Sequence, residues 1–409
     1  MVIKIEKSRA AGTVEAPPSK SAAHRMLISA ALSGKGAEVG GIEYSEDVKA
    51  TLRCIEAMGV KYKEEKGNLV FCERAGDLEV SERIFDCGES GSTLRFFIPI
   101  ALTDGVKTTF KGTQKLLSRP LEVYEEIFKD EGIQYTHTAD SVTVEGKLSK
   151  REYTVRGDVS SQFVTGLLFA LSVLGGGRVN VTPPLLSRPY IEMTQSALKC
   201  FGINTESGEE ADGTLWYSVS GCFEPASVKV EGDWSSAAFL DALGMLGGDV
   251  TVGGLDEESL QGDKIYKDHY KRIKAGYCTL DISNTPDLGP ILMALGAAFN
   301  GVELIGTSRL KLKESDRGNV MAEVLEEFSI PVKVYEDKII VQGGYSLKAP
   351  KNTLSGYNDH RVVMSEAVLM TLTGGSIKGA EAVRKSYPDF FERIEGLGIK
   401  VSREEENDT

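Results

Sequence analysis

Basic side chains lie beside small polar residues at the starts of apolar stretches, a pattern that predicts binding sites for anions. In the first stretch, Lys20, Ser21 and Arg25 lead into an almost entirely apolar run that is ended by Gly34. Such a run is typical of a buried helix, and a helix start carries unpaired backbone N–H groups and the positive end of the helix dipole. Ser21 and Arg25 are four residues apart and share one helix face. We therefore expect a small anion to bind there.

Similar polar clusters recur along the chain and combine cations with hydroxyl, amide and carboxyl groups. Each has an ordinary explanation, because serines cap helices and aspartates such as Asp316 and Asp359 can hold a neighbouring arginine. Together, so many cations at buried helix starts would be costly without anionic partners, so the set favours small anionic ligands. The clusters are Gly91 with Arg95, Arg119, Ser160-Ser161-Gln162, Ser187-Arg188-Pro189-Tyr190, Asp287, Lys313-Glu314-Ser315-Asp316-Arg317, Asn358-Asp359-His360-Arg361 and Lys385.

The composition is that of an ordinary soluble globular protein, with 41% hydrophobic and 26% charged residues. A net charge of −13 argues against a nucleic-acid or anionic-membrane surface, because both require a basic patch. The amino terminus lacks the apolar core of a signal peptide, and the longest apolar runs are far shorter than the roughly 20 residues that cross a bilayer. We expect a cytoplasmic protein.

The chemistry predicted from the clusters requires no metal or cofactor. The six cysteines and four histidines are scattered, without a C-x-x-C pair or an H-x-x-x-H spacing. The common glycine-rich fingerprints of ATP and dinucleotide sites are also missing from the sequence. We expect buried thiols, no metal and no cofactor.

A small polar turn that runs into an apolar helix occurs six times, which predicts a repeated supersecondary unit. After the first of these helices, residues 37–42 are typical of a strand, residues 45–58 of an amphipathic helix ended by Gly59, and residues 60–72 of a hairpin around Lys66-Gly67-Asn68. The later units follow this template, and the fourth matches it least well. The six turns begin at Pro17, Gly88, Asp158, Asp233, Thr285 and Asn358.

The sixth unit ends after a single strand, and residues 2–6 alternate as a strand that could complete it. The amino terminus would then belong to the carboxy-terminal half. We expect one domain of residues 1–14 and 228–409 and a second of residues 15–227, with the chain crossing near residues 12–17 and 221–228. Ligands are expected in the cleft between the halves, towards which the helix starts would point.

The clusters, in order from end to end of the chain, resemble those of the 3-phosphoshikimate 1-carboxyvinyltransferase (EPSP synthase) family. The most specific motifs are KESDR at 313–317 and YNDHR at 357–361, together with SSQF at 160–163 and SRPYI at 187–191. The resemblance implies an α/β fold of two domains, each of three βαβαββ units with buried parallel helices, the inverse α/β barrel of enolpyruvyl transferases. It also implies transfer of the enolpyruvyl group of phosphoenolpyruvate to the 5-hydroxyl of shikimate 3-phosphate.

The resemblance implies roles for individual residues, and a monomer that acts on these two small anions. Asp287 would take the proton of the attacking hydroxyl, Glu314 would protonate the methylene carbon, and Lys20 would also be catalytic. These opposite proton transfers need two carboxyl groups in different environments. Contacts to shikimate 3-phosphate would come from Lys20, Ser21, Arg25, Ser160, Ser161, Gln162, Ser187, Asp287 and Lys313. Contacts to phosphoenolpyruvate would come from Lys20, Gly91, Arg119, Gln162, Arg317, Arg361 and Lys385.

The chain departs from the family pattern at Glu89, where asparagine is usual, and at Arg309, where an asparagine can contact shikimate 3-phosphate, the acceptor of the enolpyruvyl group.

One alternative is the related transferase that acts on UDP-N-acetylglucosamine, which is expected to lack SSQF and YNDHR and to carry a cysteine near phosphoenolpyruvate, the donor. Cys87 is the candidate for that cysteine. A second alternative is a non-catalytic anion-binding protein, against which the presence of both Asp287 and Glu314 argues.

Overall fold

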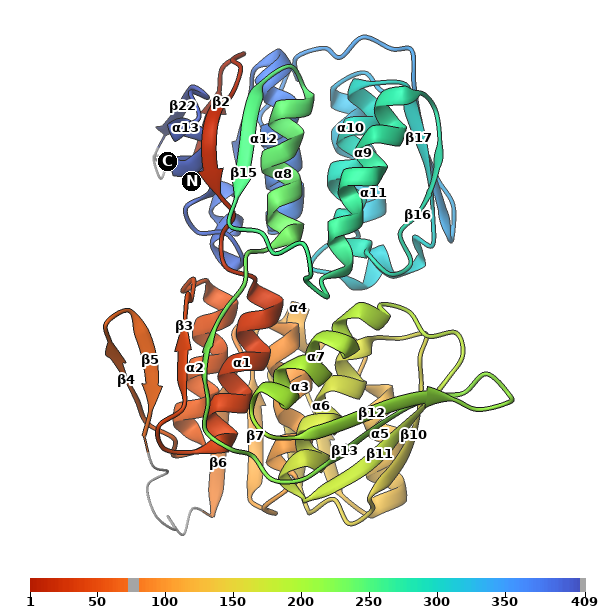
Figure 1. Cartoon of the computed structure of the whole chain (residues 1–409). Helices are drawn as coiled ribbons and strands as arrows, with labels where there is room; N and C mark the ends of the chain where they lie inside the picture. Colours follow the sequence, from red (N-terminus) through yellow and green to blue (C-terminus); the bar gives the residue numbers. More distant parts are fainter. Residues whose placement is uncertain (73–80, 405–409) are drawn as a thin grey trace. The chain divides into compact units, whose positions relative to one another are not determined.

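A computed structural model describes residues 1–72 and 81–404. The chain divides into two compact units: unit 1 comprises Met1–Ser19 and Gly232–Thr409, and unit 2 comprises Lys20–Glu231. Figure 1 shows each unit as inner helices flanked by sheets and outer helices. Residues 12–17, expected as a connection, instead lie largely in strand β2 (Ala11–Glu15), which pairs in parallel with β15 (Asp249–Gly253).

Unit 2 contains three four-stranded sheets within the described residues, each with the same order of strands. In each sheet two parallel strands are followed by an antiparallel hairpin, which is the βαβαββ pattern predicted from the sequence. The sheets are β14 (Ser227–Lys229)–β3 (Glu38–Gly40)–β5 (Asn68–Phe71)–β4 (Tyr62–Glu65), β6 (Glu82–Asp86)–β7 (Lys107–Lys111)–β9 (Ser141–Glu145)–β8 (Gln134–His137), and β10 (Glu152–Arg156)–β11 (Gly176–Thr182)–β13 (Leu215–Ser220)–β12 (Asn204–Glu209).

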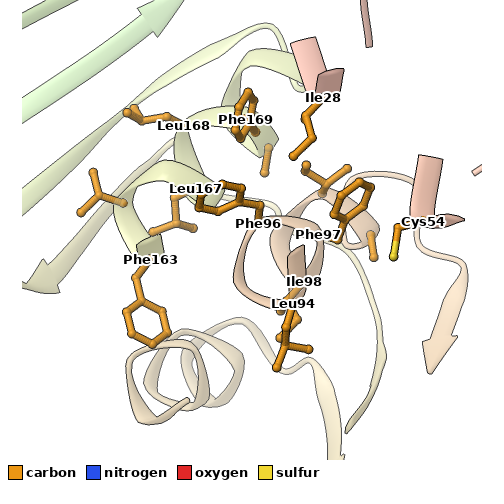
Figure 2. Packing of buried hydrophobic residues seen from close by; sticks show 14 of the residues in the cluster. Ile28, Cys54, Leu94, Phe96, Phe97, Ile98, Phe163, Leu167, Leu168 and Phe169 are labelled. Atoms are coloured by element: carbon orange, nitrogen blue, oxygen red, sulfur yellow. The ribbon is translucent and has the colours of Figure 1, made fainter. Parts of the chain in front are cut away.

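The helices of unit 2 are of two kinds. The inner helices α1 (Lys20–Ser33), α3 (Gly91–Ala101) and α6 (Ser161–Val173) are buried on nearly all sides, so their sequences are apolar all round. Side chains of α3 and α6 pack together: Phe96 lies beside Leu167 in Figure 2, and its ring centroid is 6.0 Å from that of Phe169. The outer helices are amphipathic: α2 (Glu46–Ala57), α5 (Glu122–Glu131) and α7 (Arg188–Cys200), with a short α4 (Gln114–Leu117) before α5.

Unit 1 repeats this plan with the inner helices α8 (Trp234–Met245), α10 (Gly289–Ala298) and α12 (His360–Thr373). The outer helices are α9 (Tyr266–Ala275), α11 (Arg317–Glu327) and α13 (Phe390–Gly396). Short 3-10 helices precede four of these helices: η1 (Gly262–Ile265) before α9, η2 (Pro286–Leu288) before α10, η3 (Ser308–Leu312) before α11 and η4 (Ala380–Lys385) before α13. Its sheets are β2–β15, β16 (Thr279–Asp281)–β17 (Gly301–Ile305)–β19 (Lys338–Gln342)–β18 (Val332–Val334), and β20 (Leu354–Ser355)–β21 (Gly375–Lys378)–β1 (Val2–Ile5)–β22 (Val401–Glu404).

The amino-terminal strand completes the sixth unit, as the sequence predicted. Strand β1 lies between β21 and β22 and pairs with both in antiparallel register, with Val2 opposite Lys378 on one side and Glu404 on the other. The fourth unit is the weakest match to the template because its sheet has only the pair β2–β15 among the described residues. In unit 1 and in unit 2, some sheets contain a strand that is distant in sequence from its partners. These strands are β14 in unit 2 and β1 and β2 in unit 1.

Candidate active site

The polar turns predicted before the apolar helices act as helix caps. The side chains of Ser90 and Ser160 accept hydrogen bonds from backbone N–H groups at the starts of α3 and α6. Asp233 and Asp359 do the same for α8 and α12. These caps fix the position of the charged and hydroxyl side chains that follow them.

In unit 2, Lys20 forms a largely buried ion pair at the start of α1. Its Nζ lies 2.7 Å from Oδ2 of Asp47 on α2, and the two side chains are 15% and 12% exposed. An ion pair this well shielded from water holds the lysine in one position more firmly than a surface pair would. The partner Asp47 was not identified from the sequence.

Arg25 is buried on α1, 3% exposed, and donates to neutral oxygen atoms. Its Nε lies 2.8 Å from Oγ1 of Thr194, its Nη1 2.6 Å from the carbonyl oxygen of Ser21, and its Nη2 2.9 Å from that of Tyr190. Its guanidinium also lies over the ring of Phe96. Burial lowers the pKa of Arg25 to about 10, which leaves it charged at neutral pH. The contacts shared by α1 and α7 thus hold a full positive charge at the side of Ser21.

Three residues predicted to contact phosphoenolpyruvate, the enolpyruvyl donor, lie together at the start of α3. A Cβ atom on Gly91 would lie 2.6 Å from Nη1 of Arg119 and 3.9 Å from Oε1 of Gln162. Gln162 accepts from Nη1 of Arg95 at 2.8 Å and donates through Nε2 to Oγ of Ser92 at 2.9 Å. Gly91 therefore lets Arg119 approach the backbone closely, and the hydrogen bonds of Gln162 fix its amide.

The predicted serines of unit 2 lie at or beside the starts of α6 and α7. Ser160 and Ser161 are 8% and 4% exposed, and Ser187 is 1% exposed. Ser187 has a left-handed backbone conformation with φ of 61°, which is uncommon for residues other than glycine, and immediately precedes α7. Helices α6 and α7 pack together, and α1 packs on α7. Arg25 joins the starts of α1 and α7, because it donates to the carbonyl oxygens of both Ser21 and Tyr190.

In unit 1, the carboxylate of Asp287 is shared by three cations. Its Oδ1 lies 2.7 Å from Nη1 of Arg317 and 3.1 Å from Nζ of Lys313, and its Oδ2 lies 3.2 Å from Nη2 of Arg361. Burial alone would raise the pKa of Asp287, but the charges of Arg361, Lys313 and Arg317 outweigh it and hold the pKa well below its ordinary value. Asp287 is therefore ionised and tightly held.

Arg317 also holds the second predicted catalytic carboxylate. Its Nη2 lies 2.6 Å from Oε2 of Glu314, and its Nε and Nη2 bind Asp359 at 2.9 and 3.2 Å. Burial would lower the pKa of Arg317, but Asp359, Glu314 and Asp287 together raise it above its ordinary value. Asp359 thus holds an arginine side chain, but that of Arg317 and not that of Arg361, whose backbone N–H it accepts. Asp316 caps α11.

The remaining predicted residues of unit 1 lie on two of the 3-10 helices. Lys385, at the end of η4, donates from Nζ to the carbonyl oxygen of Asn358 at 2.6 Å. Arg309, in η3, is 8% exposed. Burial lowers the pKa of Lys313, and the charges of Arg317 and Arg309 lower it further against the attraction of Asp287.

Cys87, the possible donor-side cysteine of the alternative transferase, is fully buried. Burial and the neighbouring thiol of Cys54 raise the pKa of the Cys87 thiol well above its ordinary value, which disfavours the reactive thiolate. Over residues 1–72 and 81–404, no group of three or more His, Cys, Asp or Glu side chains could hold a metal ion. None of the helices in these ranges has the length and apolar character needed to cross a bilayer.

Solved structures place this fold among the enolpyruvyl transferases. The EPSP synthase of Acinetobacter baumannii superposes with a TM-score of 0.74 at 22% identity, covering 98% of this chain and all of that one. The enolpyruvyl transferase NikO from Streptomyces tendae gives a TM-score of 0.75 at 14% identity, covering 98% of each chain. At these identities the likeness shows the fold, which confirms the predicted architecture of two domains of repeated units.

Sequence relatives identify the family. The model of EPSP synthase (3-phosphoshikimate 1-carboxyvinyltransferase) matches residues 5–394. The 3-phosphoshikimate 1-carboxyvinyltransferases of Clostridium novyi and Clostridium kluyveri are 38% and 36% identical, covering 97% and 98% of both chains, respectively. The chain belongs to the EPSP synthase family. It transfers the enolpyruvyl group of phosphoenolpyruvate to the 5-hydroxyl of shikimate 3-phosphate and releases phosphate, a step of aromatic amino acid biosynthesis.

Proposed function

We propose that the residues of unit 2 mainly recognise the anionic groups of the two substrates. Arg25 supports this most directly, because its buried guanidinium is satisfied by neutral oxygen atoms and keeps its charge for a ligand. We assign Lys20, Ser21, Arg25, Ser160, Ser161, Gln162 and Ser187 to shikimate 3-phosphate. Lys20, Gly91, Arg119 and Gln162 are assigned to phosphoenolpyruvate.

The residues of unit 1 are assigned mainly to proton transfer and to the donor. Asp287 is the base for the attacking hydroxyl and Glu314 the acid for the methylene carbon, with Lys20 of unit 2 as the third catalytic residue. Asp287 and Lys313 also contact shikimate 3-phosphate, and Arg317, Arg361 and Lys385 contact phosphoenolpyruvate. The observation that carries this assignment is that Arg317 binds both Asp287 and Glu314, at 2.7 and 2.6 Å.

The cations around Asp287 explain how a weakly basic carboxylate can serve as a base. Three cations make Asp287 a poor proton acceptor before the substrates bind. A bound anion on Arg317 and Arg361 competes for their positive charge, which raises the pKa of Asp287 towards its ordinary value. Glu314 is bound to the same Arg317. When a bound anion competes for the positive charge of Arg317, the protonated form of Glu314 is favoured. One arginine thus prepares both carboxyl groups for their opposite roles.

We also propose that the enzyme acts as a cytoplasmic monomer that does not bind nucleic acid. The net charge of −13 supports the absence of nucleic-acid binding, because a nucleic-acid surface requires basic residues in excess. Equilibrium sedimentation gives the mass of the particle directly. A single species near the chain mass of 44.3 kDa is expected, and a dimer would contradict the proposal.

The assignment is tested by phosphate release from phosphoenolpyruvate. Wild-type protein should release phosphate with shikimate 3-phosphate and not with UDP-N-acetylglucosamine. Arg361→Ala should then raise the KM for phosphoenolpyruvate about 10- to 100-fold, because a charged hydrogen bond is worth roughly 1.5 to 3 kcal/mol. An unchanged donor KM would remove Arg361 from the donor site. Release with the nucleotide sugar alone would overturn the acceptor assignment.

A further inference from the structure

Four buried polar side chains of unit 2 form a continuous chain of hydrogen bonds across helices α1, α2 and α3, which are neighbours in Figure 1. Nδ1 of His24 lies 2.7 Å from Oγ1 of Thr51, which lies 2.8 Å from Oγ1 of Thr93. The hydroxyl of Thr93 donates to Oγ of Ser90 at 2.7 Å, and its backbone N–H donates to the same oxygen at 3.2 Å. All four residues are 0% exposed. The chain therefore links His24 on α1 with Ser90, the cap of α3.

The chain has one consistent direction. Thr93 gives its hydroxyl proton to Ser90, so it must accept a hydrogen bond from Thr51. Thr51 then has no proton left for His24, so Nδ1 of His24 is the donor and Nε2 carries no proton. Among the described residues Nε2 has no hydrogen-bond partner, and burial together with the nearby cations of α1 lowers the pKa of His24, which keeps the ring neutral. Thr51 must thus both accept and donate, which a hydroxyl group can do and an apolar side chain cannot.

The same face of α2 also holds a residue of the proposed donor site. Asp47 and Thr51 are four residues apart on α2, as Lys20 and His24 are on α1, so the two contacts between these helices lie one turn apart. Asp47 binds Lys20 at 2.7 Å, and Thr51 binds His24 at the same distance. Helix α2 is thus bonded to α1 at Lys20 and, through Thr51, to the start of α3.

We propose that Thr51 is a positioning residue for the binding of phosphoenolpyruvate, because its hydrogen bonds to His24 and Thr93 fix the start of α3 relative to α1. The inference rests on the proposed donor contacts of Lys20 and Gly91. A shift of either helix would leave a buried polar group of the chain unpaired, which is costly in a water-free interior. The donor therefore meets a site that is already arranged, and little of its binding free energy is used to order α3.

The test compares Thr51→Val, which keeps the shape of the side chain without its hydroxyl, with Thr51→Ser, which keeps the hydroxyl. With saturating shikimate 3-phosphate, the KM of Thr51→Val for phosphoenolpyruvate should rise about tenfold, which corresponds to about 1.4 kcal/mol. Its kcat should stay within about threefold of wild type, because Lys20 keeps its own bond to Asp47. Thr51→Ser should restore the donor KM to within about threefold of wild type.

An unchanged donor KM in Thr51→Val would overturn the inference. The donor site at the start of α3 is tested separately by Gly91→Ala, so the two failures can be told apart. A fall in kcat with an unchanged donor KM would also overturn the inference, because it would place the effect of Thr51 on turnover and not on binding.

Thr109→Val is the matched control. Thr109 on β7 shares a hydroxyl–hydroxyl hydrogen bond of 3.0 Å with Thr143 on β9, within a sheet of the same unit and not at a helix start. The same change of threonine to valine should leave the donor KM unchanged there, and urea unfolding reports how much stability each variant loses. A similar rise of the donor KM in Thr109→Val and Thr51→Val would show a general effect of lost stability and overturn the inference.

Thr93→Val breaks the next link of the chain and keeps the inference testable if Thr51→Val does not fold. It should raise the donor KM by a similar factor of about ten, again with kcat nearly kept. Where both variants fold, the double variant should be no worse than either single variant, because a chain that is already broken cannot be broken again. A normal donor KM in Thr93→Val, or additive losses in the double variant, would overturn the inference.

Discussion

Arg25 and Arg95 of unit 2 and Arg317 of unit 1 are buried arginines with different kinds of hydrogen-bond partner. In unit 2, Arg25 donates to a threonine hydroxyl and two backbone carbonyls, and Arg95 donates to an amide and a carbonyl. In unit 1, Arg317 is surrounded by Asp287, Glu314 and Asp359. Neutral acceptors orient a guanidinium without cancelling its charge, whereas carboxylates cancel the charge and are themselves held ionised.

This difference implies a division of labour. A cation with neutral partners is prepared to bind an anionic ligand, because no internal carboxylate must be displaced. A cation with carboxylate partners controls how strongly those carboxylates bind protons. We therefore infer that unit 2 contributes mainly to substrate affinity and unit 1 mainly to turnover.

Replacing Asp287 should give the largest effect. Asp287→Asn keeps a hydrogen-bond acceptor but cannot take a proton, so kcat should fall on the order of 100- to 10,000-fold. The acceptor KM should change by less than about threefold. Initial rates at saturating substrates measure both values. Asp316→Asn is the control, because asparagine caps a helix as well as aspartate does and should leave kcat unchanged. Near-normal turnover of Asp287→Asn would show that unit 1 does not supply the base.

Replacing Arg25 should have the complementary effect. Arg25→Lys keeps the charge but loses the fork of donors to Thr194, Ser21 and Tyr190. The KM for shikimate 3-phosphate should rise about 10- to 100-fold, since charged hydrogen bonds are worth roughly 1.5 to 3 kcal/mol. Arg156→Lys, at an exposed pair with Asp158, is the control. A fall in kcat without a change in KM would contradict the division of labour.

A methyl group on Gly91 should disturb affinity for the donor without affecting proton transfer. The added Cβ would lie 2.6 Å from Nη1 of Arg119, so that side chain must move. Overpacking costs roughly 1 to 3 kcal/mol, and we expect the donor KM of Gly91→Ala to rise about tenfold with kcat nearly kept. Gly396→Ala adds a Cβ with nothing within 4 Å and serves as the control. A normal donor KM would place Arg119 outside the donor site.

A carboxyl group of unit 1 without a cation sharpens the contrast with Asp287. Both oxygens of Glu366, on α12, are buried without a hydrogen-bond partner, and burial raises its pKa well above the ordinary value. Folded protein then binds one proton more than unfolded protein, so the stability that this proton provides is present at low pH and is lost as pH rises. As pH rises, the free energy of unfolding of Glu366→Gln should therefore increase relative to that of wild type, by up to about 1.4 kcal/mol per pH unit.

Urea unfolding at pH 5, 6 and 7 measures this difference. Glu326→Gln, at an exposed position on α11, should show a constant difference from wild type across the same range. If the free energy of unfolding of Glu366→Gln instead falls relative to that of wild type as pH rises, Glu366 is ionised in the folded protein.

The parts of the fold that the sequence predicts are those governed by local pattern. The apolar inner helices, the amphipathic outer helices and the hairpin around Lys66 follow from periodicity and turn chemistry. The pairing of β1 with β22 was predictable because the repeat left one strand missing. Strands β2 and β14 were not, because they are short, largely exposed and paired with partners far away in the chain.

The site shows the same limit. Lys20, Arg25, Asp287 and Arg317 could be proposed from the sequence because they lie in recognisable clusters of polar residues. Their partners Asp47 and Thr194 come from other helices, 27 and 169 residues away, and nothing local marks them.

A double-mutant cycle of Asp287→Asn and Arg25→Lys tests the division of labour most directly, with kcat and the acceptor KM measured for all four proteins. The double variant should have the kcat of Asp287→Asn and the KM of Arg25→Lys, with the two changes additive within about 0.5 kcal/mol. If Arg25→Lys lowers kcat further, or Asp287→Asn raises the acceptor KM as much as Arg25→Lys does, the two units share one task and the account is wrong.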